Sequence, residues 1–195
     1  MAFVAFLDAC VLYQATLRDV LLSLAEEDVY QVRWSPHVLD EMVKNVGARL
    51  GLDPKQALAG AEYARSMMEQ AFPDAAVEPD AYVPLVPVMA NHPKDRHVLA
   101  AAIVARADVL VTSNIKDFPT AACQPYNLEV QHPDIFLQHQ FGLNPELITM
   151  VLVRLASERK QPPMTDVEDI LTALQVEHPR FVAMARTHIR KSKDA

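Results

Sequence analysis

The stretch Ala107–Phe118, which reads ADVLVTSNIKDF, decides the fold class. Its run DVLVT at residues 108–112 has the composition of a strand that is buried on both faces of a parallel sheet. Polar residues follow directly and include Asp117. A second run of this kind, FVAFL at residues 3–7, ends at Asp8. Two such strands predict a sheet with carboxylates near its carboxyl edge, which is where ligands of open α/β sheets bind.

Helical patterns separate the predicted strands. Helical spacing of apolar residues is seen over residues 11–24, after Ser35-Pro36, from residue 54 to about residue 70, and over the Ala-rich segment 94–106. Shorter strands are expected at residues 31–34, 76–77 and 128–130, and a proline-rich loop is expected over most of residues 72–93. Alternating strands and helices favour an α/β fold, with a mostly parallel central sheet flanked by helices.

The pattern after Gly142 is helical only. One helix is expected after Asn144-Pro145, a second after the capping box TDVE at residues 165–168, and a third over residues 179–189. We therefore predict one domain over residues 1–142 and a C-terminal helical extension over residues 143–195.

Composition and charge limit the function classes. Hydrophobic residues make up 51% of the 195 residues and charged residues 22%, as in ordinary globular proteins. No apolar run reaches the roughly 20 residues of a membrane span, and the N-terminus lacks the basic lead-in of a signal peptide. Two cysteines form no disulfide framework. We expect a cytoplasmic protein that does not contact a membrane. The net charge of −7 on its own disfavours nucleic-acid binding.

Four acidic residues are candidates for a metal site. Asp8 and Asp117 follow strands, while Glu41 and Asp95 lie near the starts of helices. Each has an ordinary structural alternative as a capping, turn or solvated residue. Together they offer the oxygen ligands that suit Mg²⁺ or Mn²⁺. Such ions can activate water and stabilise the leaving oxygen of a phosphodiester, so a nuclease is one interpretation.

Four segments, in this order, resemble the PIN-domain family: FLD at residues 6–8, SPHVLDE at 35–41, DRHVLAAA at 95–102 and ADVLVTSNIKDF at 107–118. The resemblance covers about residues 1–140. It implies Mg²⁺- or Mn²⁺-dependent cleavage of RNA, with catalysis and metal binding at Asp8, Glu41, Asp95 and Asp117. Thr112 and Asn114 match polar positions beside that site. Arg96, next to Asp95, is a candidate phosphate contact.

Many bacterial members of this family are VapC toxins. The resemblance therefore implies an endoribonuclease toxin of a VapBC-type toxin–antitoxin system, with RNA as substrate, a VapB-type antitoxin as protein partner, and a homodimer as its assembly. The proline-rich segment at residues 72–93 and the helices after Gly142 depart from the compact form of the family.

Two other interpretations stay open at this point. The chain could be a PIN-like module that binds RNA or protein without catalysis. It could also be a haloacid-dehalogenase-type phosphatase that uses Asp8 as nucleophile. Such a phosphatase needs a second aspartate two residues further on, where this chain has Cys10. Neither Cys10 nor Cys123 has a convincing His or Asp partner in the sequence, which disfavours a thiol nucleophile.

Overall fold

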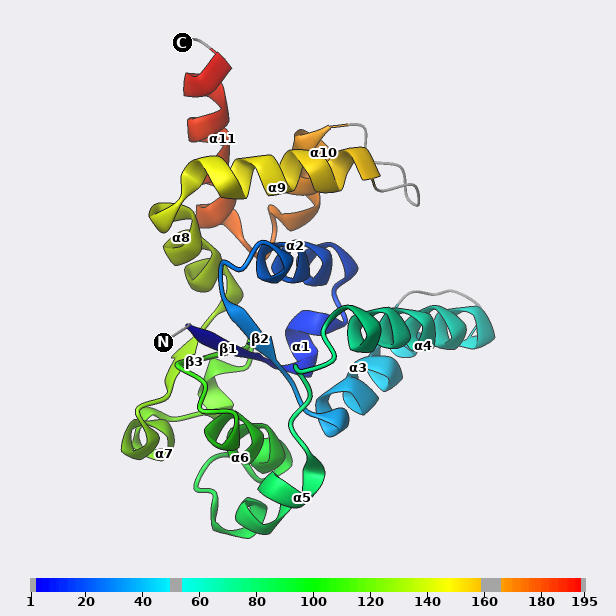
Figure 1. Cartoon of the computed structure of the whole chain (residues 1–195), viewed down its shortest axis with the longest axis vertical. Helices are drawn as coiled ribbons and strands as arrows, with labels where there is room; N and C mark the ends of the chain where they lie inside the picture. Colours follow the sequence, from blue (N-terminus) through cyan, green and yellow to red (C-terminus); the bar gives the residue numbers. More distant parts are fainter. Residues whose placement is uncertain (1–2, 50–53, 159–165, 194–195) are drawn as a thin grey trace. The chain divides into compact units, whose positions relative to one another are not determined.

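A parallel four-stranded sheet is the centre of the fold in the computed structural model, which describes residues 3–49, 54–158 and 166–193 (Figure 1). The strands are β1 (Val4–Leu7), β2 (Gln31–Arg33), β3 (Val109–Val111) and β4 (Glu129–Gln131), in the order β2-β1-β3-β4. Ala5 lies opposite Val32 on one side and Val109 on the other. Residues 5–7 and 109–111 are fully buried, which explains the uninterrupted apolar runs of the two central strands. The predicted α/β fold is confirmed.

The chain divides into two compact units. The first comprises residues 1–14 and 30–131 and contains the sheet. The second comprises residues 15–29 and 132–195. The helices of the first unit are α1 (Ala9–Leu12), α3 (Pro36–Arg49), α4 (Pro54–Ala71), α5 (Pro79–Tyr82), α6 (Arg96–Val104) and α7 (Thr120–Cys123), with 3-10 helices η1 (Val83–Val88), η2 (Pro93–Asp95), η3 (Ile115–Asp117) and η4 (Gln124–Tyr126).

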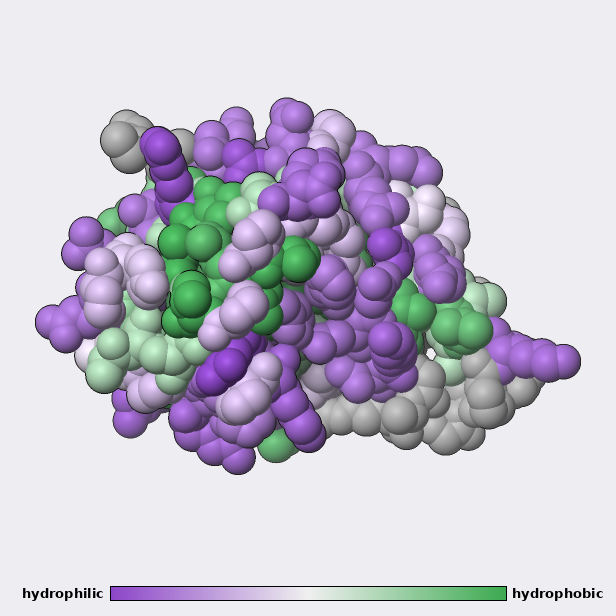
Figure 2. Space-filling model, turned by 90° about the horizontal axis from the view of Figure 1, so that it is seen from below, coloured by the Kyte–Doolittle hydropathy of each residue, from purple (hydrophilic) through white to green (hydrophobic). Residues whose placement is uncertain are grey.

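The segment between α4 and η2 differs from its expected form. The strand predicted at residues 76–77 is reduced to an isolated parallel bridge between Trp34 and Ala76. Pro79 follows soon after and begins α5, so the chain leaves the sheet at once. The proline-rich part is therefore helical rather than loop, although Val83 and Val88 stay exposed. Figure 2 shows one face of the molecule, on which apolar side chains gather among hydrophilic ones.

The second unit is entirely helical among its described residues. It contains α2 (Ala15–Glu26), α8 (Pro133–Leu143), α9 (Pro145–Glu158), α10 (Val167–Leu174) and α11 (Pro179–Lys193). Helix α2 packs against α9 and α10, and α11 packs against α8 (Figure 1). Leu17, Val20 and Leu24 of α2 are buried in this core, as are Val151 and Leu152 of α9.

Three helical predictions need correction. The helix expected over residues 11–24 is two helices, because the chain turns at Tyr13-Gln14 and α1 ends there. Helix α8 was not predicted. The capping box of α10 is formed by Asp166 with Asp169 rather than by residues 165 and 168. Thr165 lies outside the described residues, as does the segment 159–164.

The domain boundary at residue 142 stays a prediction. Helix α2, although early in the sequence, belongs to the second unit together with the predicted extension. We propose that residues 143–195 are an extension that completes this helical unit, not a domain that folds by itself. Among the described helices, none has both the length and the hydropathy that a membrane span requires.

Candidate metal centre

The carboxyl edge of the sheet carries the first two candidate residues. Asp8 follows β1 directly, and its Oδ1 accepts a hydrogen bond of 2.7 Å from the backbone N–H of Ala9, which caps α1. Thr112 follows β3, which pairs with β1 in parallel. The backbone N–H of Asp8 donates to the carbonyl of Val111 at 3.1 Å. Because parallel strands end at the same edge, Asp8 and Thr112 are brought together there.

A network of short contacts holds the Asp8 carboxylate. Thr112 Oγ1 donates to Asp8 Oδ2 at 2.6 Å, and Cys10 Sγ donates to the same oxygen at 3.2 Å. Thr112 Oγ1 also accepts a bond of 3.0 Å from the backbone N–H of Asn114. Asp8 is only 3% exposed. Cys10 therefore has an acidic partner, contrary to expectation, and its role is to orient Asp8.

Cys10 is not a nucleophile at neutral pH. Burial, followed by the charge of Asp8, raises the pKa of its thiol to about 12. The thiol stays protonated and serves as a donor. The only signal in the sequence was its position two residues after Asp8, which by itself does not predict this contact.

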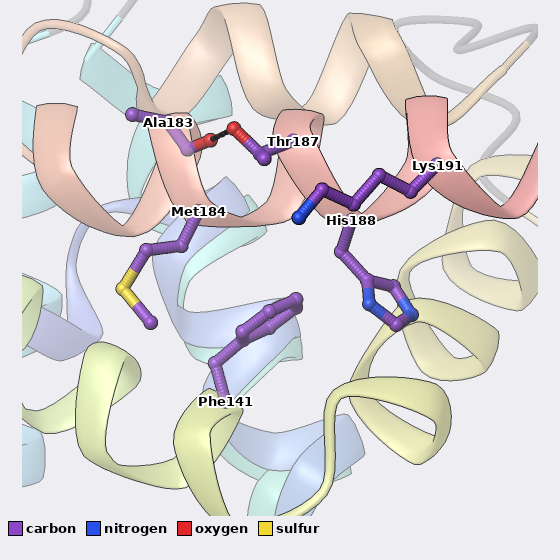
Figure 3. A pocket seen from close by; sticks show the side chains of 6 residues that line it. All are labelled: Phe141, Ala183, Met184, Thr187, His188 and Lys191. Atoms are coloured by element: carbon purple, nitrogen blue, oxygen red, sulfur yellow. Dashed lines mark hydrogen bonds between the residues drawn. The ribbon is translucent and has the colours of Figure 1, made fainter.

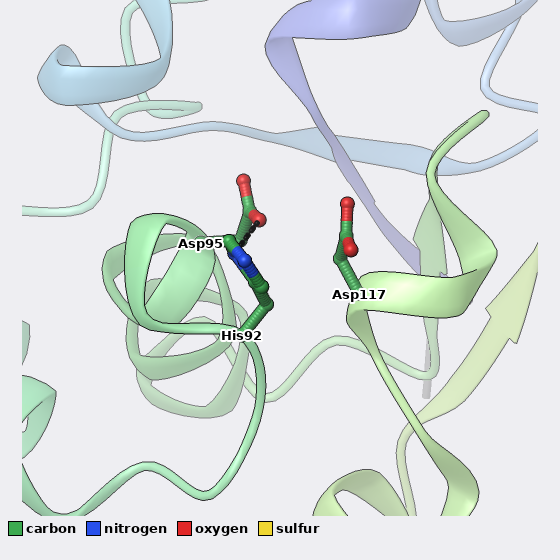
Figure 4. A group of neighbouring side chains, drawn as sticks. All are labelled: His92, Asp95 and Asp117. Atoms are coloured by element: carbon green, nitrogen blue, oxygen red, sulfur yellow. Dashed lines mark ion pairs between the residues drawn. The ribbon is translucent and has the colours of Figure 1, made fainter.

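Asp95 and Asp117 form a second pair, together with His92. Each of the three offers one ligand atom, and these atoms all lie within 4.8 Å of one another (Figure 4). Asp95 is the last residue of η2, and His92 directly precedes η2. Asp117 is the last residue of η3. His92 Nδ1 lies 3.2 Å from Asp95 Oδ2. The sequence does not mark His92 as a metal ligand, and its place among the acids is found only in the structure.

Glu41 of α3 forms an ion pair with His97. His97 Nε2 of α6 lies 3.5 Å from Glu41 Oε1, at ion-pair distance. The pKa of His97 is raised overall: burial opposes this, but the hydrogen bond and the charge of Glu41 raise it, and Asp8 adds to the effect. His97 thereby links Glu41 to the acids at the edge of the sheet.

The pKa of Asp95 responds to the neighbouring acids. It is raised by burial, then by Asp117, and to a smaller degree by Glu41, while His92 lowers it. The pKa of Asp8 is raised by burial, which outweighs its hydrogen bonds, and Asp95 raises it further. Asp95 thus interacts electrostatically with each of the other three acids. The structure places ligand atoms of Asp95 and Asp117 within 4.8 Å of each other, and the assignment of all four acids to one metal site stays a prediction.

The donor set fits a divalent cation. Within the described ranges, no lysine or arginine forms an ion pair with Asp8, Glu41, Asp95 or Asp117. Carboxylates that repel one another without a basic partner are relieved by a bound cation. Asp95 and Asp117 would hold such an ion, and the roles of Asp8 and Glu41 as further ligands stay predictions.

The predicted auxiliary residues differ in their positions. Thr112 and Asn114 belong to the network around Asp8. Arg96 begins α6 directly after Asp95, and its buried Nε has no hydrogen-bond partner among the described residues. Nothing in its contacts ties Arg96 to the acids, so its role as a phosphate contact stays a prediction.

Two hollows in the described part of the chain carry no acidic group comparable to that of the metal centre. One of about 490 Å³ lies beside Ile115 and Phe118 and has Glu129 as its single acid. Another, of about 400 Å³, lies in the second unit between Phe141 of α8 and the side chains of α11, with Lys191 at its rim (Figure 3). Neither set of lining residues brings carboxylates together, so the centre around Asp95 is the better metal site.

Replacing Asp8 with asparagine is expected to change how stability depends on pH. Because burial raises the pKa of Asp8 above its ordinary 3.8, the folded state holds this proton more tightly than the unfolded state. This contribution to stability is present at low pH and is lost as pH rises through the folded pKa. In the presence of a chelator, the free energy of unfolding of Asp8→Asn should therefore rise relative to that of the wild type as pH increases from just above 3.8 towards neutrality.

Urea unfolding over that pH range measures this difference. The matched control is Asp74→Asn, because Asp74 is exposed. The control should follow the wild type. A constant difference between Asp8→Asn and the wild type over the whole range would contradict the prediction.

Comparisons with known proteins show the family of the chain. Residues 4–116 match the family described as "PIN domain", and residues 133–187 match the "VapC50 C-terminal domain". Over 105 residues the chain is 44% identical to the protein described as "Putative ribonuclease VapC50" of Mycobacterium tuberculosis (strain ATCC 25618 / H37Rv). That region spans 54% of this chain and 62% of the relative, which is less than two thirds of its length. No solved structure matches the chain. The PIN match covers more than half of the 195 residues, and the chain therefore belongs to the PIN-domain family, in a VapC-like form with a C-terminal extension.

Proposed function

We propose that this protein is a metal-dependent endoribonuclease of the VapC type. The observation that carries the proposal is the group of His92, Asp95 and Asp117 in a PIN-family chain. The effects of Asp95 on the pKa of Asp8 and of Glu41 on the pKa of Asp95 support Asp8 and Glu41 as further members of the site. The likeness to a relative named as a ribonuclease supports the reaction class. The proposed cofactor is Mg²⁺ or Mn²⁺.

In the proposed reaction, some residues of the site would bind the metal ion and others would position the attacking water. A bound divalent cation supplies Lewis-acid stabilisation of charge on the phosphate and lowers the pKa of water. Asp8, Asp95 and Asp117 hold the cation, and the Thr112 and Cys10 donors keep Asp8 Oδ2 in place. Glu41, positioned by His97, orients the attacking water towards the phosphorus and accepts its proton.

The proposed partners follow from the VapC-like form of the chain. RNA is the substrate, a VapB-type antitoxin is the inhibitory partner, and the protein acts in the cytoplasm as a homodimer. With a net charge of −7, RNA contacts depend on local cations. Lys94 and Arg96, which flank Asp95 in sequence, are the candidates for contacts to phosphate beside the metal centre.

The two rival functions are supported less well. A haloacid-dehalogenase-type phosphatase needs an acid–base group two residues after its nucleophile, but here Cys10 is a protonated thiol held against Asp8. An acyl-phosphate trapped on Asp8 would revive that rival. A non-catalytic module is opposed by the complete set of four acids. It would be favoured if replacing all four left every cellular effect of the protein unchanged.

Cleavage of total cellular RNA by the purified full chain tests the proposed function. The chain is freed of any antitoxin, stripped of metal with a chelator, and supplied with Mg²⁺ or Mn²⁺. Fragments of defined length that form only with added metal would support the proposal. Cutting that persists in the chelator would contradict metal dependence, and intact RNA under all conditions would contradict the nuclease activity.

A further inference from the structure

The metal centre contains one nitrogen donor among its carboxylates. His92 Nδ1 lies 3.2 Å from Asp95 Oδ2, and a ligand atom of His92 lies within 4.8 Å of ligand atoms of both Asp95 and Asp117. Figure 4 shows the imidazole beside Asp95, with Asp117 facing them from another segment. Neighbouring ligands of an octahedral ion with bonds of about 2.1 Å lie about 3 Å apart. The observed spacing therefore suits two ligands of one ion.

The backbone around His92 is fixed by bonds on both sides. The backbone N–H of His92 donates to the carbonyl of Asp117 at 3.0 Å, and the N–H of Asp95 donates to the carbonyl of His92 at 2.9 Å. The buried Asn91 side chain donates to the carbonyl of Asp95 at 2.9 Å. Pro93 restricts the backbone of His92, the residue before it. The imidazole is thus attached to the same frame that carries Asp95 and Asp117, and its place among the acids follows from the fold.

We propose that His92 is a metal ligand of this centre, which makes it a mixed imidazole–carboxylate site that prefers a transition-metal ion such as Mn²⁺ to Mg²⁺. Mg²⁺ prefers oxygen ligands and gives up its bound water molecules reluctantly. An imidazole ligand, in contrast, adds affinity for divalent transition metals. This inference rests on the proposed function only in that a divalent cation binds here.

The contact with Asp95 is compatible with this role. A neutral imidazole has one ring nitrogen with a free lone pair, which it can give to an ion while the other nitrogen keeps its proton. His92 is exposed, so an ion can reach the imidazole without any movement of the core.

Metal binding to the full chain tests the proposal without measuring RNA cleavage. Calorimetry gives the affinities of the chelator-treated protein for Mn²⁺ and Mg²⁺, and pulsed electron paramagnetic resonance of bound Mn²⁺ detects coupling to a directly bound imidazole nitrogen. The variants are His92→Gln, the control His139→Gln at an exposed position of α8, and Asp95→Asn. Circular dichroism confirms that each variant is folded.

The wild type and His139→Gln should show nitrogen coupling, and His92→Gln should lose it. We expect His92→Gln to weaken Mn²⁺ binding about tenfold or more and Mg²⁺ binding far less. The ratio of the Mn²⁺ affinity to the Mg²⁺ affinity should therefore be smaller in His92→Gln than in the wild type. Asp95→Asn should lose the tight Mn²⁺ site. The proposal is overturned if the wild type binds no Mn²⁺ or shows no nitrogen coupling, if the coupling persists in His92→Gln or Asp95→Asn, or if His92→Gln weakens both ions equally.

Nitrogen coupling and RNA cleavage are separate measurements, so they test the metal ligand and the nuclease independently. Nitrogen coupling that depends on His92, in a chain that cuts no RNA, would refute the nuclease and keep the metal ligand. Metal-dependent cutting of RNA by a chain without such coupling would keep the nuclease and refute the ligand.

Discussion

Replacing Asp95 with asparagine is expected to lower the rate of RNA cleavage by about 10³-fold or more. Asparagine has the shape of aspartate but not its charge, and Asp95 interacts electrostatically with Asp8, Asp117 and Glu41. Metal-ion catalysis contributes several kcal/mol to a phosphodiester reaction, and each 1.36 kcal/mol is about tenfold in rate. Loss of one central ligand therefore removes most of the activity.

The same substitution should leave the fold intact. Burial and the neighbouring acids raise the pKa of Asp95, so its charge is unfavourable in the metal-free protein and removing it costs no stability. Initial rates on a purified RNA at saturating metal, together with urea unfolding, measure both effects. The control is Asp74→Asn, which carries the same substitution at an exposed position. An Asp95→Asn variant that cuts at the wild-type rate would show that the activity belongs to another site or to a contaminant.

Ending the chain at residue 142 is expected to prevent the remaining protein from folding stably. Helix α2 packs against α9 and α10, both of which this truncation removes. Leu17, Val20, Leu21 and Leu24 are fully or almost fully buried. Burial of one such side chain contributes about 1.5–3 kcal/mol, so four of them contribute an amount comparable to the about 5–15 kcal/mol of a whole domain.

Expression of residues 1–142 beside the full chain measures this effect through solubility, circular dichroism and urea unfolding. The matched control is a truncated chain in which Leu17, Leu21 and Leu24 are replaced by glutamine, which removes the exposed apolar stripe of α2. This control should recover solubility. A truncation with unchanged side chains that is soluble, cooperatively folded and as stable as the full chain would contradict the prediction and favour an independent domain over residues 1–142.

The sequence was sufficient to predict the elements whose signal is local. Strands β1 and β3 lie at the centre of the sheet, and their burial on both faces requires the apolar runs that were recognised. Helix α8 was not predicted, although Pro133 in its first turn is an ordinary start signal. Its N-cap is His132, whose side chain accepts a bond of 3.2 Å from the N–H of Asp134, and histidine is not among the usual capping residues.

The part of the candidate site that directly follows the strands could be predicted from the sequence. Asp8 and Thr112 meet because β1 and β3 are parallel neighbours. The contribution of His92 could not be predicted in this way, since it depends on the backbone bond between His92 and Asp117. The contact of Cys10 with Asp8 depends on the geometry of the turn into α1, which residue spacing does not report.

The membership of α2 in the second unit has a consequence for the order of folding during synthesis. A ribosome adds about 5–20 residues per second, so α2 is made on the order of ten seconds before the helices that cover its apolar side. Contacts between residues so far apart in sequence also form slowly, because a long loop must close first. The nascent chain therefore presents an uncovered amphipathic helix for that interval, and a chaperone has a defined segment and time at which to bind it.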